Sequence, residues 1–170
     1  IPVKDIIHIA VKSMGLDDLS PFNPAEKIIE YRIAEKYGPL ALMKIHEFSD
    51  ELSSNSPAPG GGSVSALAGV LGASLSSMVA NLTFGKKKWL TKYEKMCEIS
   101  ERSQKLKDEL IQLIDKDTDS FNVLMEAYSL PKNTHKEIQQ RNSAVDSAMK
   151  EAANIPFLTL IRCREIMNLA

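Results

Sequence analysis

Apolar side chains recur every three or four residues along most of the chain, which is the spacing of an amphipathic helix. This spacing predicts helices over 40–52, 63–83 and 89–129. A Thr-His-Lys-Glu capping box opens another helix over 134–153, and Pro156 suits the first turn of a further one. Almost no stretch alternates between apolar and polar residues, so the sequence predicts an all-α fold, a bundle of long helices.

The N-terminal part of the chain has a different pattern. A short helix is predicted there and should end near Gly15. Three prolines then fall between residues 21 and 39, and the isoleucine-rich run 28–33 favours one short strand. We therefore expect a short, Pro-rich N-terminal connector ahead of the bundle.

The composition of the chain argues against some classes of binding partner but does not identify one. The 170 residues include 21 basic and 22 acidic side chains, a net charge of -1, so no overall field attracts nucleic acid or an anionic membrane, and neither partner is expected. Cys97 and Cys163 lie far apart in apolar, helix-like surroundings, which favours reduced thiols and a cytoplasmic location. His8, His46 and His135 have no metal-ligand spacing with each other or with the cysteines, so no metal site is predicted.

The stretch SPAPGGGSVSALAGVLGASL, residues 56–75, joins a glycine run to a helix rich in small residues. It lacks the lysine and the spacing of a phosphate-binding loop, and it is too polar for a membrane span. Ser63 is suited to cap the helix. The small residues allow another helix or a flat ligand to approach the backbone closely, and tight helix packing alone is the alternative interpretation.

Asp117 lies within the apolar stripe of the long helix, in nearly the same direction as Leu110, whereas Asp115 should point to the opposite half of that helix. A carboxylate among apolar residues needs a partner or a chemical role. The alternative to a catalytic role is a buried carboxylate satisfied by a neighbouring hydroxyl or lysine. Lys86–Lys88 follow the small-residue helix, where they could clamp an anion or simply lie at a solvated helix end.

Three motifs in order, SPAPGGGSVSALAGVLGASLSSMVANLTFGKKK, LIDKDTDSF and LPKNT, resemble the cyclodeaminase domain of the formiminotransferase-cyclodeaminase family. The segment LDDLSPFNPAEKIIEYRI is similar to the one that ends the formiminotransferase domain and leads into the cyclodeaminase. The resemblance implies that residues 1–39 are the end of a formiminotransferase-like domain and a linker. Residues 40–170 would then be a helical cyclodeaminase domain, which we expect to be truncated at its C-terminus.

The resemblance also implies an activity. Enzymes of this kind convert 5-formimidoyltetrahydrofolate to 5,10-methenyltetrahydrofolate with release of ammonia, in histidine breakdown. The resemblance implies that tetrahydrofolate carries the reacting group, that the folate substrate is polyglutamylated, and that no metal takes part. It also implies that the protein is a homodimer or a higher homo-oligomer. Two alternatives stay open: a 5,10-methenyltetrahydrofolate cyclohydrolase, which the GKKK run favours, and a non-catalytic helical module for assembly or folate channelling.

Site residues follow from matching the motifs position by position. The family's catalytic aspartate corresponds to Asp117, with Asp115 as the second choice. The resemblance assigns the folate-binding positions to Pro59, Gly60, Gly61, Gly62, Ser63, Lys86, Lys87, Lys132 and Asn133.

Overall fold

A computed structural model describes residues 3–18, 20–31 and 37–169 and divides the chain into two compact units, Ile1–Tyr37 and Gly38–Ala170. The residues described contain helices and turns and no strand. The prediction of an all-α fold is therefore confirmed.

The first unit contains two short helices. Helix α1, Val3–Ser13, is followed by Gly15 in the left-handed conformation, with φ of 64°. Helix α2, Pro24–Lys27, is capped by Asn23, whose side chain accepts a hydrogen bond from the Ala25 N–H.

The strand predicted over 28–33 is not observed. Residues 29–31 are helical, and residues 32–33 lie outside the described part. The Asn cap and the proline in the first turn of α2 start a helix in this region, and such local signals outweigh the weaker β preference of isoleucine.

The second unit opens with a run of turns over 38–43, followed by helix α4, Ile45–Leu52. The predicted helix 40–52 therefore begins five residues late. In place of its first turns, residues 39–42 form turns, and the Leu40 and Ala41 N–H groups donate to the Asp115 carboxylate. Phe48 of α4 is buried in the main core.

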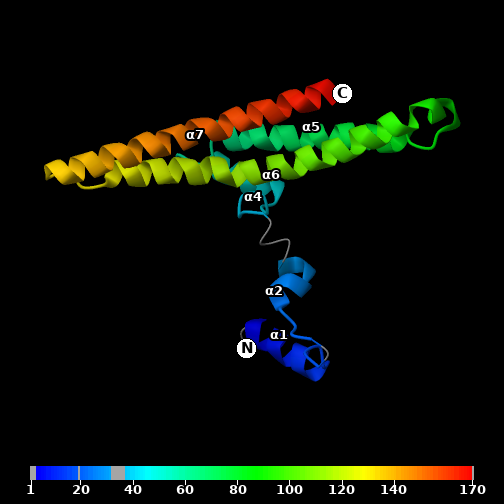
Figure 1. Ribbon diagram of the computed structural model, residues 1–170, viewed down its shortest axis with the longest axis horizontal. Helices are drawn as coiled ribbons and strands as arrows, with labels where there is room; N and C mark the ends of the chain where they lie inside the picture. Colours follow the sequence, from blue (N-terminus) through cyan, green and yellow to red (C-terminus); the bar gives the residue numbers. More distant parts are fainter. Residues whose placement is uncertain (1–2, 19, 32–36, 170) are drawn as a thin grey trace. The chain divides into compact units, whose positions relative to one another are not determined.

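Three long helices make up the rest of this unit: α5, Gly61–Thr83; α6, Tyr93–Ser129; and α7, His135–Leu169. Figure 1 shows α6 antiparallel to both α5 and α7. A 3-10 turn, η1, Lys87–Lys92, joins α5 to α6, so the helix predicted from residue 89 begins as an α-helix only at Tyr93.

Two predictions concern helix α7, the capping box at its beginning and a break before Pro156. The capping box is confirmed, since the Glu137 N–H donates to Thr134 Oγ1 at 3.2 Å and the Thr134 N–H donates to Glu137 Oε2 at 3.0 Å. The break expected before Pro156 is absent, because Pro156 lies inside α7. Ile155 and Thr159 on either side are buried, and this packing holds the helix together across the missing hydrogen bond.

The small-residue face of α5 lies against the other two long helices. Ala66 and Ala73 are fully buried in a core that includes Leu106 and Leu110 of α6. A methyl group added at Gly69 would lie 2.8 Å from Cys163 Sγ of α7 and 3.1 Å from a Leu110 methyl group. The stripe therefore serves close helix packing along the middle of α5.

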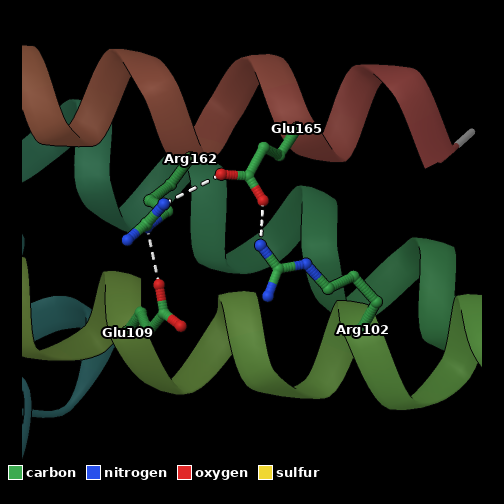
Figure 2. A network of polar contacts seen from close by, with 4 residues as sticks. All are labelled: Arg102, Glu109, Arg162 and Glu165. Atoms are coloured by element: carbon green, nitrogen blue, oxygen red, sulfur yellow. Dashed lines mark hydrogen bonds and ion pairs between the residues drawn. The ribbon is translucent and has the colours of Figure 1, made fainter.

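Four charged side chains link α6 to α7 (Figure 2). Arg102 binds Glu165, and Arg162 bridges Glu165 Oε1 at 2.8 Å and Glu109 Oε2 at 2.6 Å. The hydrogen bond from Arg102, helped by Arg162, lowers the pKa of Glu165 below its ordinary value of 4.5. These pairs fix the antiparallel register of the two helices.

Candidate functional site

Two aspartates on α6, Asp115 and Asp117, each bind the backbone of a different segment. Asp115 is 7% exposed, and its two oxygens accept the Leu40 and Ala41 N–H groups at 2.8 and 3.1 Å. A methyl group at Gly38 would lie 2.2 Å from its Cγ. The turns over 38–43 cover Asp115, and both of its oxygens are used in holding them.

The Asp117 side chain extends from α6 to the first turn of α5 and caps that helix. Its Oδ2 accepts a hydrogen bond from the Ser63 N–H at 3.0 Å. Ser63 is the third residue of α5, and Gly60 at the capping position has no side chain to bind this N–H. Asp117 therefore takes the role that a capping side chain normally has. The capping role expected for Ser63 is wrong because α5 begins two residues earlier, at Gly61.

Ser63 is fully buried and turned toward α6. Its Oγ donates to the Ile114 carbonyl oxygen at 2.7 Å and lies 3.4 Å from both Asp117 Oδ2 and Thr118 Oγ1. The Ser63 side chain thus joins the first turn of α5 to the turn of α6 that carries Asp117.

A small cavity of about 130 Å³ lies beside Asp117, between the loop before α5 and helices α6 and α7. Ligand pockets usually have about 300–1,000 Å³, so a ligand against Asp117 must extend beyond this cavity. Its lining consists of Pro57, Ala58, Gly60, Asp117, Thr118, Ser120, Phe121 and Ala152.

Sequence reasoning identified Gly60 and Asp117 of this lining and missed the other residues. Phe121 is one helical turn from Asp117, so helical spacing offered a signal for it. Ala152 comes from α7, and no local pattern indicates that it lies here.

The glycine run faces two different surroundings. Methyl groups added at Gly60 or Gly61 would meet no atom within 4 Å, whereas one added at Gly62 would lie 2.0 Å from Asp117 Oδ1. Pro59 is buried. Open space for a ligand therefore lies next to Gly60 and Gly61, and the Gly62 backbone is against the Asp117 carboxylate.

The structure does not bring the remaining predicted residues to this cavity. Lys86 and Lys87 follow the far end of α5, which is about 34 Å long at 1.5 Å per residue. Lys132 and Asn133 lie in the exposed turn after α6, about three helical turns beyond Asp117. Within a single chain, the glycine run therefore lies beside Asp117, whereas Lys86, Lys87 and Lys132 lie away from both.

Other side chains with metal-binding or nucleophilic chemistry do not form a second site in the described part of the chain. No three His, Cys, Asp or Glu side chains there are grouped so as to hold a metal ion. Cys97 and Cys163 are free thiols, and burial raises the pKa of Cys163.

Comparison with known proteins gives relatives that are similar over most of this chain. A methenyltetrahydrofolate cyclohydrolase from Methylorubrum extorquens is 40% identical over 74% of this chain and 61% of its own length. Formimidoyltransferase-cyclodeaminases from Gallus gallus and Dictyostelium discoideum are 35% and 40% identical over 95% and 91% of this chain. The chain spans 30% and 28% of the lengths of these two proteins.

The fold has a solved counterpart. A formiminotetrahydrofolate cyclodeaminase from Thermotoga maritima is similar with a TM-score of 0.52 and 25% identity, over 75% of this chain and 74% of its own. Residues 1–34 match the Formiminotransferase domain, and residues 44–170 match Formiminotransferase-cyclodeaminase. The chain belongs to the formiminotransferase-cyclodeaminase family.

Proposed function

We propose that this protein closes the ring of 5-formimidoyltetrahydrofolate to give 5,10-methenyltetrahydrofolate and ammonia, as a cytoplasmic step of histidine breakdown. The observation that carries the proposal is the Asp117 carboxylate, which lines a cavity next to the open backbone of Gly60 and Gly61. The formimidoyltransferase-cyclodeaminases similar to most of this chain support the choice of substrate.

The reaction needs one group that takes a proton and returns it. N10 of the folate attacks the carbon of the protonated formimidoyl group and loses its proton. The departing NH2 group gains one proton and leaves as ammonia, and the methenyl product keeps the positive charge. A single carboxylate within reach of both nitrogens can perform the two transfers in turn. Oδ2 of Asp117 is held by Ser63, and Oδ1 accepts no hydrogen bond from the residues that the structure describes. We therefore assign the proton transfer to Oδ1.

A cyclohydrolase is the second candidate, and the Methylorubrum relative is the observation that favours it. In that reaction water would attack the methenyl carbon, and the same carboxylate would take the proton of the water. The two candidates are separated by giving one preparation both folates. Ammonia release from the formimidoyl compound supports the first, and methenyl hydrolysis without ammonia release supports the second. Folate binding with neither reaction would favour the non-catalytic module.

We also propose a homodimer. Leu71, Leu75, Met78 and Leu82 form the outer face of α5, opposite its packed side, and are 48–60% exposed. A helix that is apolar all round is normally buried. A second copy would cover this face, and it would also be able to bring Lys86 and Lys87 to a folate that its partner holds at Asp117.

The apolar character of α5 has another interpretation, since α5 is long and apolar enough to cross a membrane by length and composition. Its inner face, however, carries the buried hydroxyls of Ser63 and Ser77, which are hydrogen-bonded with α6. These polar contacts fit a core helix of a bundle. We therefore propose a folate ligand and a protein partner, with no membrane and no nucleic acid.

A further inference from the structure

We propose that Gly62 is a positioning residue for Asp117, and that glycine is needed there by the protein's own carboxylate rather than by the folate. This inference rests on the proposed function, because it concerns how the group that transfers the proton is held. It separates Gly62 from Gly60 and Gly61, which the motif presents as equivalent.

The geometry at the three glycines carries the distinction. A methyl group at Gly62 would lie 2.0, 2.3 and 2.5 Å from Oδ1, Cγ and Oδ2 of Asp117, whereas Gly60 and Gly61 have open space. All three carboxyl atoms are too close, so rotation of the carboxyl group cannot relieve the overlap. The whole Asp117 side chain would have to move, and its hydrogen bond with the Ser63 N–H would break.

Ser63 completes the arrangement from the other side. Its N–H holds Oδ2 at 3.0 Å, while its buried Oγ is fixed to the Ile114 carbonyl oxygen at 2.7 Å. The bare Gly62 backbone lets the carboxylate lie close enough for this contact. One oxygen is then used for positioning, and Oδ1 is left for proton transfer.

The kinetic test compares Gly62→Ala with Gly72→Ala. Gly72 is in the same helix, and a methyl group there would meet only an Ile166 methyl group at 3.8 Å. We expect Gly62→Ala to lower kcat by about 100-fold or more, the usual contribution of a general acid–base group. The folate KM should stay within about threefold, and Gly72→Ala should change neither constant by more than about threefold.

A double variant adds a check on the mechanism. If Gly62 acts through Asp117, combining Gly62→Ala with Asp117→Asn should lower kcat no further than Asp117→Asn alone. Normal kcat in Gly62→Ala would overturn the inference. A raised KM with unchanged kcat would also overturn it, because it would show that Gly62 borders the folate.

Amide hydrogen exchange gives a readout that does not depend on activity. The Ser63 N–H should be protected in the wild type and in Gly61→Ala, and should exchange at least about tenfold faster in Gly62→Ala and in Asp117→Ala. Circular dichroism checks that each variant is folded. If the wild type releases no ammonia but shows this pattern, the proposed function fails and the positioning role stands. Unchanged protection in Gly62→Ala would reject the positioning role, even in an active enzyme.

Discussion

Asp117 of α6 accepts a hydrogen bond from the Ser63 N–H at the beginning of α5, 54 residues away in the sequence. This contact joins the glycine run to the acid that we propose for catalysis. The Ser63 hydroxyl strengthens the junction by donating to the Ile114 carbonyl oxygen. The same few atoms therefore cap a helix, fix the packing of two helices and orient a carboxylate.

Replacing Ser63 by alanine should weaken this junction without breaking the Asp117 contact through the backbone. The variant loses one buried hydrogen bond, and the Ile114 carbonyl oxygen keeps its place in the helix, so we expect a loss of about 1 kcal/mol in the free energy of unfolding. Urea unfolding measures this loss. A loss below the error of the fit would show that the hydroxyl contributes little to the junction.

Asp115→Ala should cost more stability than Asp117→Ala. Asp115 is buried and binds two backbone N–H groups, those of Leu40 and Ala41. Leaving buried donors unpaired costs about 1–3 kcal/mol each. We expect a lowered urea midpoint and faster amide exchange at Leu40 and Ala41. Retained stability together with lost turnover would instead identify Asp115 as the catalytic acid.

The ion pairs of Glu165 should make the free energy of unfolding depend on pH. Because its pKa in the folded protein is below the ordinary value of 4.5, its ion pairs stabilise the fold above that value, and this contribution is lost as the pH falls through the lowered pKa. The side chain is 27% exposed, so solvent screening limits the contribution to about 1 kcal/mol or less.

The substitution Glu165→Gln tests this directly. The variant should be less stable than the wild type at neutral pH, and the two proteins should converge in acid, below the lowered pKa of Glu165, as followed by urea unfolding. A difference that is the same at both pH values would show that packing, rather than charge, is responsible.

The proposed homodimer is tested on the outer face of α5. Replacing Leu71 and Leu75 together by lysine should shift the protein from dimer to monomer in sedimentation equilibrium, because the charges would be buried in the interface. Ile45→Lys is a suitable control, since Ile45 is 86% exposed and lies on α4. Dimers of equal strength in all three proteins would place the interface elsewhere.

Local patterns predicted the helices but not how they meet. The 3.6-residue period identified the stripe that contains Asp117, because α6 is regular over that region. The contact of Asp117 with Ser63 depends on the register between α5 and α6, and the burial of Asp115 depends on the turns over 38–43 that cross α6. Neither depends on residues close in sequence, so neither could be found by periodicity.

Local patterns also failed to predict that α7 continues through Pro156 and that Lys86 and Lys87 lie far from the glycine run. A proline signals a helix end when only local hydrogen bonds are considered, but tertiary packing carries α7 through it. The motif order placed Lys86 and Lys87 in one folate site with the glycine run. Within one chain, the length of α5 separates these lysines from the glycine run. The length of the helix predicted over 63–83 already indicated this separation.

Ammonia release from 5-formimidoyltetrahydrofolate, measured for the wild type and for Asp117→Asn in parallel, tests the central claim most directly. Asparagine can still accept the Ser63 N–H, so the variant should keep its thermal midpoint while it cannot carry the proton. We predict steady ammonia release by the wild type and a loss of about 100-fold or more in the variant. Near-normal turnover by Asp117→Asn would contradict the role of Asp117, and no ammonia release by the wild type would contradict the proposed reaction.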